Sequence, residues 1–279
     1  MKHLKHVFSA SLLILIGYFI FQGFVPNKIN NFVIVIPSYN NEQWYKNNLN
    51  SVFSQTYFNY RVIYIDDCSS DGTYSLVKDY LEKNNKTEKV ILIKNNKRCG
   101  ALANHYKAIH MCKDDEIIVC LDGDDWFAND NVLKYLNKIY QDPKIWLTYG
   151  QFANWPTGQL GWCEEIPKDI VKQNKFREFG FVSPQLRTYY AWLAKKVKFE
   201  DLLYKNKDGK LDFFPIAGDV ALMFPMLEMA AFHFKFIPKI LCQRNVATEL
   251  NDFKVNPDLQ IEVTNFIRSK KPYKRLEIS

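Results

Sequence analysis

The chain has 279 residues, of which 47% are hydrophobic and 15% aromatic, and its net charge is +7. This composition is too apolar for a disordered chain and is enough to bury one large core or two small ones. Basic residues are densest at 268–275, where we expect a solvated terminus and no nucleic-acid partner. The six cysteines form no CxxC pair and no zinc-ligand spacing, so the sequence indicates neither a zinc site nor a disulfide framework.

The first predicted element is a membrane segment at residues 7–25. This run has no charged residue, follows Lys2 and Lys5, and is close to the minimum length for a helix that crosses a bilayer. We expect residues 1–26 to form an uncleaved, single-pass anchor that makes the protein membrane-associated, with the domain outside. A cleaved signal segment, giving a secreted or lumenal protein, is the alternative, although no small-x-small cleavage site follows the run.

Four short apolar segments after this run predict buried parallel strands. They are residues 31–37, 61–66, 89–93 and 116–121, all rich in β-branched residues. Helix-length segments separate them, and the clearest begins after Asp71 and places Val77 and Leu81 on one face. The alternation predicts an α/β fold with a doubly wound, mostly parallel sheet and helices on both faces.

Polar side chains follow three of these strands. The segments are Pro37-Ser38-Tyr39-Asn40, Asp66-Asp67-Cys68-Ser69-Ser70-Asp71-Gly72 and Asp122-Gly123-Asp124-Asp125. Because ligands of doubly wound sheets bind beyond the carboxyl ends of the strands, we expect these segments on one rim. Side chains alternate along a strand, so only one of Asp66 and Asp67 can face the cleft, and we choose Asp67.

The acidic segment 122–125 follows five apolar residues. Three carboxylates at the end of a buried strand repel one another and lose hydration, so a cation, water or backbone donors must compensate them. The chain has no GxGxxG and no GxxxxGK, but an Asp-x-Asp can hold a hard divalent ion that bridges diphosphate oxygens. The simpler alternative is a polar turn before a helix near 128–140, with Asp130 as its cap.

Spacing excludes two other sites at this segment. An EF-hand that began at Asp122 would need an oxygen ligand at Trp126, Gly at Phe127 and Glu at Leu133. A phosphatase of the haloacid dehalogenase type would need Thr or Val where Trp126 stands, and its Asp-x-Asp usually opens the domain.

Four motifs occur in order along the first half of the chain. They are Val35-Ile36-Pro37-Ser38-Tyr39-Asn40, Gln55-Thr56-Tyr57, Ile65-Asp66-Asp67-Cys68-Ser69-Ser70-Asp71-Gly72-Thr73 and Leu121-Asp122-Gly123-Asp124-Asp125-Trp126. Together they resemble glycosyltransferase family 2, inverting enzymes of the A-type nucleotide-sugar fold (GT-A). The resemblance is close over residues 32–150 and looser over 213–243. Two positions depart from it: Cys68 replaces a usual Gly, and Leu102-Ala103-Asn104-His105 lacks an arginine that is often present.

The resemblance implies a metal-dependent transferase that moves a sugar from a nucleotide-diphosphate sugar, with UDP as the expected nucleotide, to an acceptor hydroxyl with inversion. It implies Mn²⁺ or Mg²⁺ as cofactor and a glycan, lipid-linked or protein acceptor as partner. The residues implied to bind the nucleotide are Pro37, Tyr39, Asn40 and Asp67, the last through the base imide, with Arg98 for the diphosphate or base. Asp122 and Asp124 would hold ribose and metal, and Asp125 is a further candidate metal ligand.

An inverting transfer also needs a base to take the proton of the acceptor hydroxyl. The family places an acid at the start of a later helix, where this chain has Asp219 within Ile216-Ala217-Gly218-Asp219-Val220-Ala221-Leu222. A plain helix cap is the alternative role of Asp219, and Pro225 predicts a kink or break in that helix. The next candidate bases are Glu228, Glu164 and Glu165.

These expectations divide the chain into four parts. They are an anchor or signal segment at 1–26, a nucleotide-sugar-binding half at 31–150, an acceptor-binding and catalytic half at 151–243 and a basic carboxyl-terminal tail at 244–279. Aromatic residues of 150–212, such as Trp162, suit stacking on sugar rings and suit ordinary packing equally well. The alternative function is a catalytically inactive nucleotide-sugar or glycan-binding protein of the same fold, which the intact set of acids disfavours.

Overall fold

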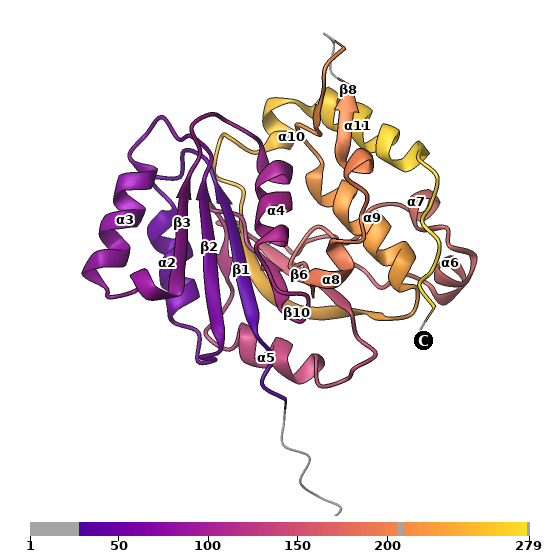
Figure 1. Ribbon diagram of the computed structural model, residues 1–279, viewed down its shortest axis with the longest axis horizontal. Coiled ribbons are helices and arrows are strands. Elements are labelled where there is room, and N and C mark those ends of the chain that lie inside the picture. Colours follow the sequence, from indigo (N-terminus) through magenta and orange to yellow (C-terminus); the bar gives the residue numbers. More distant parts are fainter. Residues whose placement is uncertain (1–27, 206–208, 278–279) are drawn as a thin grey trace, which may run out of the picture.

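The computed structural model describes residues 28–205 and 209–277. Its centre is an eight-stranded sheet of order β3-β2-β1-β4-β7-β6-β10-β5 (Figure 1). The first half of the sheet is parallel and consists of β1 (Phe32–Ser38), β2 (Tyr60–Asp66), β3 (Val90–Lys94) and β4 (Ile117–Cys120). The four predicted strands are therefore confirmed to within one residue at each end.

The second half of the sheet mixes strand directions. Its strands are β5 (Trp126–Phe127), β6 (Leu147–Trp155), β7 (Thr188–Tyr190) and β10 (Phe234–Asn245). Strand β7 is antiparallel to both β4 and β6, β10 is parallel to β6, and β5 is antiparallel to β10. The two halves expected of the chain thus share one sheet, and residue 150 lies inside β6. A separate hairpin joins β8 (Leu203–Lys205) to β9 (Leu211–Phe213).

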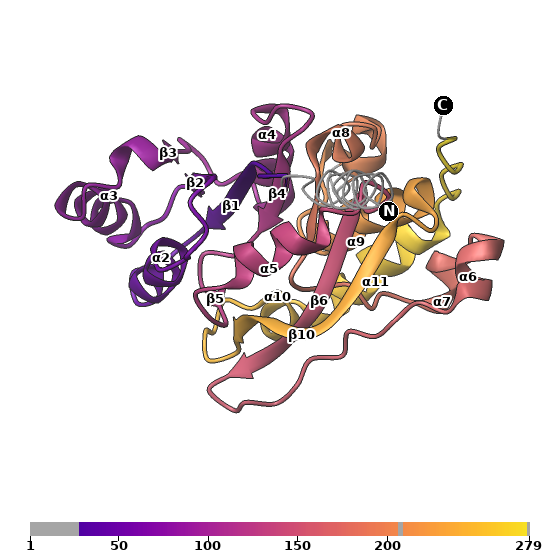
Figure 2. The same cartoon turned by 90° about the horizontal axis from the view of Figure 1, so that it is seen from below.

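Helices cover both faces of the sheet, which confirms the doubly wound fold (Figure 2). One face carries α2 (Tyr45–Phe53), α3 (Thr73–Lys83) and α5 (Val132–Ile139), and the other carries α4 (Ala101–His110) and α9 (Gly218–Ala230). Side chains alternate along a strand, which explains this arrangement. Ile34 and Ile36 of β1 belong to the core beneath α2, α3 and α5, and Val33 and Val35 belong to the core beneath α4 and α9. The shorter helices are α6 (Lys168–Gln173), α7 (Phe176–Phe179), α8 (Ala191–Ala194) and α10 (Asp252–Val255), with 3₁₀ turns at Thr87–Lys89 and Phe199–Leu202.

Two local predictions about helices need correction. Helix α5 starts at Val132 after Asn131, so Asp130 is not its cap. Helix α9 is not broken at Pro225, because its residues from Val220 to Ala230 are all buried and tertiary packing on every side supports the helix through the proline.

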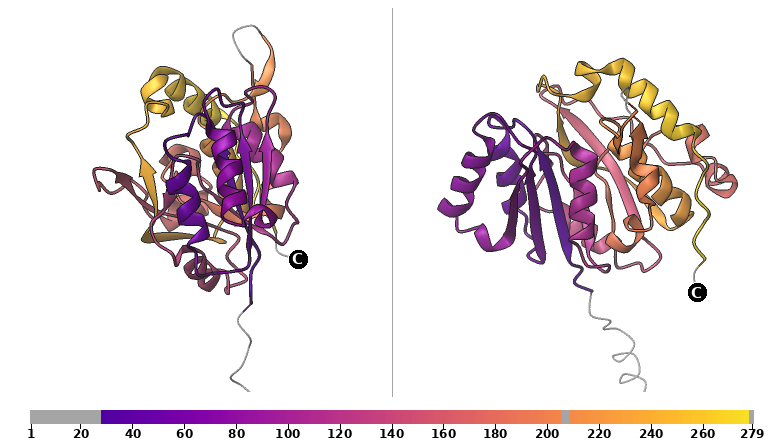
Figure 3. Two further views of the ribbon diagram at one scale, coloured as in Figure 1. Left: turned by 90° about the vertical axis from the view of Figure 1, so that its left-hand side faces the viewer. Right: turned by 45° about the horizontal axis from the view of Figure 1, so that its top comes forward.

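Residues 244–267 differ from the basic tail that the sequence suggested, whereas Lys271, Lys274 and Arg275 of the predicted solvated run are exposed. Strand β10 extends to Asn245, and helix α11 (Pro257–Ser269) follows α10 and lies against α9 (Figure 3). Val263 and Ile267 are 0% and 2% exposed and belong to the core that also contains residues of α4 and α9. Their spacing of four residues was a helical signal that the basic run after Ile267 obscured.

A buried ion pair fastens this segment to the core. Nη2 of Arg177 in α7 lies 2.9 Å from Oε2 of Glu228 in α9, and both side chains are almost fully buried. Arg177 also donates to the carbonyl of Ile267 (2.6 Å), and the backbone N–H of Tyr273 donates to Glu228 (2.9 Å). Glu228 is therefore committed to structure, which removes it as an alternative base.

Replacing Arg177 with Met should destabilise the fold by about 3–5 kcal/mol, because Glu228 would stay buried without its partner. Denaturant unfolding measures the change. The matched control is Lys78→Met, which removes an exposed pair with Glu82 and should change the unfolding free energy by no more than about 0.5 kcal/mol. Equal stability of the two variants would contradict the role of the buried pair.

The predicted membrane segment, residues 7–25, lies outside the described residues. Within 28–205 and 209–277, no helix is both long and apolar enough to cross a bilayer.

Candidate active site

The acidic segment 122–125 forms a tight turn where β4 ends. The backbone N–H of Gly123 donates to the carbonyl of Pro37 (3.0 Å), and that of Asp125 donates to the carbonyl of Asp122 (3.0 Å). A Cβ on Gly123 would lie 2.6 Å from Oγ of Ser38, so only glycine fits at this position. The turn is therefore held against the carboxyl end of β1, on the predicted rim.

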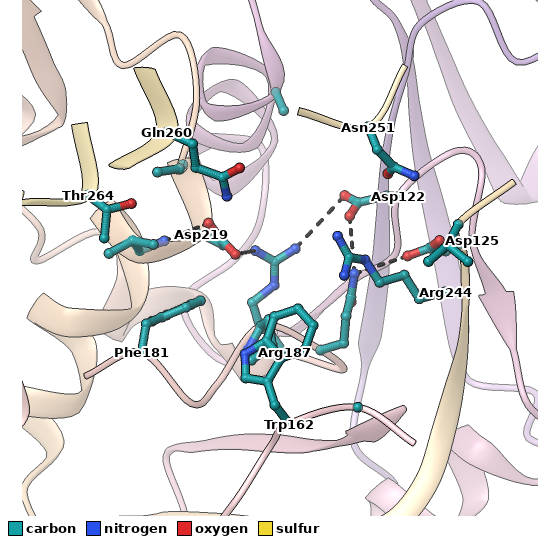
Figure 4. Close-up of a pocket in the computed structure, with 18 of the residues that line it drawn as sticks. Asp122, Asp125, Trp162, Phe181, Arg187, Asp219, Arg244, Asn251, Gln260 and Thr264 are labelled. Atoms are coloured by element: carbon teal, nitrogen blue, oxygen red, sulfur yellow. Dashed lines mark hydrogen bonds and ion pairs between the residues drawn. The ribbon is translucent and has the colours of Figure 1, made fainter. Parts of the chain in front are cut away.

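Asp122, Asp124 and Asp125 line one side of a pocket of about 960 Å³. The start of α9, with Asp219, lies across the pocket from Asp122 and Asp125 (Figure 4). Further lining residues come from α4, from α11 and from the loops 159–162 and 181–187. The structure thus brings together all four acids that were assigned to metal binding and catalysis. Glu164 and Glu165 are exposed and are not among the residues that line the pocket.

Asp125 is buried beneath the pocket and holds its floor together. Its carboxylate accepts hydrogen bonds from the backbone N–H of Asn245 (2.8 Å) and from the Gln185 amide (3.0 Å). Burial raises the pKa of Asp125 well above its usual range, and Asp124 and Asp122 raise it further. These two hydrogen bonds orient the Asp125 carboxylate, and about two of its four acceptor sites are left for a metal ligand role.

Asp122 and Asp124, the other two acids of this segment, are suited to bind a divalent ion together with a diphosphate. Within the part of the chain that the structure describes, no three Asp, Glu, His or Cys side chains converge into a closed metal cage. Mg²⁺ is commonly held by one or two carboxylates together with substrate phosphates and water. Asp122 and Asp124, both at the pocket wall, supply this kind of ligand set.

Arg187, for which no sequence pattern predicted a role, lies between Asp122 and Asp219 in the pocket. Its Nη2 is 3.9 Å from Oδ1 of Asp122, and its Nη1 is 4.0 Å from Oδ2 of Asp219 (Figure 4). Burial acts to lower the pKa of Arg187, but the surrounding groups, including Asp122 and Asp219, raise it above its usual value. A permanent positive charge therefore faces both carboxylates.

Asp219 is the second residue of α9, and its side chain is 29% exposed. The N-cap position belongs to Ala217, so Asp219 is not the helix cap that the alternative interpretation required. Its Oδ1 accepts the backbone N–H of Val220 (2.9 Å). Burial raises the pKa of Asp219, and Arg187 opposes this rise. Arg244 opposes the rise as well, so Asp219 is a pocket-facing carboxylate influenced by two guanidinium groups.

His105 of α4 also lines the pocket, in the segment where the arginine of the family pattern is missing. Burial, aided by the charge of Arg187, lowers the pKa of His105 to about 4, so its ring is neutral at pH 7. Its Nδ1 lies 3.9 Å from Sγ of Cys120. The chain therefore offers a neutral hydrogen-bonding group at this position instead of a cation.

Asp67 lies outside the pocket lining, at the carboxyl end of β2. Its carboxylate accepts hydrogen bonds from the backbone N–H groups of Cys99 (2.9 Å) and Gly100 (2.8 Å) and from the Asn95 amide (2.8 Å). Burial acts to raise the pKa of Asp67, but these donors lower it overall. A carboxylate has about four acceptor sites, so one is left for the predicted base imide.

The other predicted nucleotide-binding residues gather beside Asp67. The guanidinium of Arg98 lies 3.9 Å from the ring centroid of Tyr39, and Oδ1 of Asn40 accepts the backbone N–H of Ser70 (2.8 Å). Cys68 has φ 61°, which is the left-handed region that favours glycine, and this explains why the family usually has Gly at that position. The structure thus places the nucleotide-binding candidates at one rim, as predicted.

The mostly parallel sheet with helices on both faces, and with an acidic pair at the end of β4, matches a GT-A-like fold. The family model described as glycosyl transferase family 2 matches residues 33–197, which is more than half of the chain. The chain belongs to this family.

Three relatives illustrate the comparison. The chain is 28% identical over 119 residues to the Escherichia coli UDP-Glc:alpha-D-GlcNAc-diphosphoundecaprenol beta-1,3-glucosyltransferase WfaP, covering 43% of this chain and 45% of that protein. It superposes on S. aureus TarS 1-349 in complex with UDP-GlcNAc with TM-score 0.62 and 18% identity, covering 85% of this chain and 65% of that one. It superposes on the mannosyltransferase PcManGT from Pyrobaculum calidifontis in complex with GDP-Man and Mn²⁺ with TM-score 0.58 and 16% identity, covering 95% of this chain and 74% of that one.

Because sequence identity to these two solved structures is low, their likeness to this chain supports the fold alone. The chain spans half or less of the length of the first curated relatives that it matches, 46% and 39% for two of them.

Proposed function

We propose that the chain is a metal-dependent, inverting glycosyltransferase that moves a sugar from a UDP-linked donor to an acceptor hydroxyl. The observation that carries the proposal is the shared pocket that Asp122, Asp124 and Asp219 line, with Arg187 between Asp122 and Asp219. The relatives described above act on or bind UDP-Glc, UDP-GlcNAc or GDP-Man, which supports a nucleotide-sugar donor. The acceptor is a glycan, a lipid-linked saccharide or a protein.

In this proposal Asp219 is the general base. It takes the proton of the acceptor hydroxyl as the hydroxyl oxygen attacks the anomeric carbon. The bond from that carbon to the diphosphate oxygen breaks, the new glycosidic bond forms on the opposite face, and the nucleoside diphosphate leaves. Arg187 opposes the effect of burial on the pKa of Asp219 and so favours the ionised form that a base requires.

The nucleotide end of the donor binds at the rim of β1, β2 and β4. The ring of Tyr39 and the guanidinium of Arg98 offer flat surfaces for the base, and Asp67 accepts its imide N–H. Asp122 and Asp124 would hold Mn²⁺ or Mg²⁺, which neutralises the charge of the departing diphosphate when bound.

A donor screen tests the proposal. Purified full-length protein is incubated with a panel of nucleotide-sugars and Mn²⁺ or Mg²⁺, and release of nucleoside diphosphate is measured with and without EDTA. We expect release from a UDP-sugar that EDTA abolishes. An inactive binding protein would bind nucleotide and release none.

We also propose that residues 7–25 anchor the protein in a membrane. Full-length protein should then remain with membranes after alkaline carbonate washing, because about 19 uncharged, mostly apolar residues are enough to span a bilayer as a helix. A variant that begins at Asn27 should be released into the soluble fraction. Full-length protein that retains Met1 and is found wholly in the soluble fraction would contradict the anchor.

A further inference from the structure

Helix α11 presents an uncharged face to the pocket, apolar at Pro257 and Ile261 and polar at three other positions. Gln260, Thr264 and Asn265 line it, and none of their side chains makes a hydrogen bond within the described part of the chain. The charged residues of the same helix point elsewhere: Glu262, for example, accepts a hydrogen bond from the Tyr204 hydroxyl (2.6 Å) and is not among the pocket residues. Two amides and a hydroxyl are therefore available to a ligand in this pocket.

Trp162 forms the facing wall and is held in place by its surroundings. Its ring meets Phe152 edge-on at 5.2 Å, and the guanidinium of Arg244 lies 5.3 Å from its centroid. The backbone N–H of Gly161 donates to the carbonyl of Phe152 (2.9 Å), and a Cβ on Gly161 would overlap the Phe152 ring. Trp162 is nonetheless 52% exposed and lines the pocket, so an aromatic surface is available to a ligand there.

We infer that Trp162 and the polar face of α11 form a subsite for a neutral sugar ring of the acceptor, next to Asp219. The inference rests on the proposed function and names the substrate class at its acceptor end. A sugar ring packs its C–H face on an aromatic ring and exchanges hydrogen bonds with amides and hydroxyls. In Figure 4, Gln260 and Thr264 lie on one side of Asp219 and Arg187, and Trp162 lies on the other.

The charge of the pocket favours a neutral acceptor over an anionic one. Three partly exposed carboxylates line the pocket, from Asp122, Asp124 and Asp219, against two guanidinium groups, from Arg187 and Arg244. His105 adds no charge at pH 7, because burial lowers its pKa to about 4. A uronic acid or phosphate on the acceptor would therefore approach Asp219 against an excess of negative charge.

Oligosaccharide binding tests the inference on the full-length protein without donor or metal. The probes are chito-, cello- and malto-oligosaccharides, with oligogalacturonate as the acidic counterpart, and ligand-observed NMR measures the binding. We expect the parent to bind at least one neutral series and Trp162→Ala to bind it about 10-fold more weakly, as the loss of one aromatic contact predicts. Trp162→Phe should retain most of the affinity, and Gln260→Leu should lose several-fold.

The matched control is Phe58→Ala, which removes an aromatic side chain that is 69% exposed and is not part of the pocket lining. Its affinity should equal that of the parent. Parental affinity in Trp162→Ala, tighter binding of oligogalacturonate, or no binding of any neutral series at millimolar concentration would each overturn the inference. Because this assay uses no donor, a failure of sugar transfer in the donor screen would refute the proposed function separately.

Discussion

Replacing Asp219 with Asn should slow sugar transfer by about 10²- to 10⁴-fold, which corresponds to roughly 3–5 kcal/mol of barrier. The amide keeps the size of the side chain but cannot accept the proton of the acceptor hydroxyl. Donor binding should change little, because the proposed function assigns the nucleotide end to Asp67, Asp122 and Asp124. Transfer rates at saturating donor, together with UDP binding, measure the two effects.

The pH profile provides a second check on Asp219. A carboxyl group acts as a base only when it is ionised, and burial raises the pKa of Asp219. The parental rate should therefore fall as the pH decreases through that raised pKa, and Asp219→Asn should lack this fall. The control Asp258→Asn removes an exposed acid from the first turn of α11 and should leave the rate unchanged. A parental rate in Asp219→Asn would leave Asp219 with only a structural role, visible in the melting temperature alone.

Replacing Asp124 with Asn should abolish turnover and remove the metal-dependent part of nucleotide binding, while the protein stays folded. Asp124 belongs to the acidic pair at the pocket wall, and an amide is a much weaker ligand than a carboxylate for a hard divalent ion. Calorimetric titration with UDP, with and without Mn²⁺, measures the effect.

The matched control for this experiment is Asp130→Asn, a few residues along the chain. Asp130 is exposed and does not line the pocket, so UDP should bind this variant as it binds the parent. If Asp124→Asn also binds UDP equally well in both conditions, Asp124 has no role at the metal.

Local patterns in the sequence were enough to predict the first half of the sheet and the rim. Strands β1 to β4 are continuous runs of β-branched and apolar residues, and such runs specify buried parallel strands without long-range information. Once the strands are parallel, their carboxyl ends share one edge, so the segments after Pro37, Asp66 and Leu121 had to meet there. Asp219 was found through its place in a family pattern, and the structure puts it across the same pocket.

Predictions failed where a segment depends on distant contacts. Residues 244–279 were expected to be a basic tail, but burial of Val263 and Ile267 against the core makes 257–269 a helix that contributes to the pocket. The solvated terminus expected at 268–275 agrees with the exposure of Lys271, Lys274 and Arg275. Likewise, Pro225 suggested a kink or a break, and surrounding packing keeps that helix continuous, which contradicts the break.

The sequence by itself determined which strands form and which acids reach the rim, because β-strand patterns and strand-end positions are properties of short segments. Only the tertiary structure decided that β7 inserts between β4 and β6, that Arg187 stands between Asp122 and Asp219, and that α11 faces Trp162. Each of these arrangements joins residues tens to more than a hundred positions apart. No periodicity within a window of one helix or strand carries that information, since packing of the whole core selects the partners.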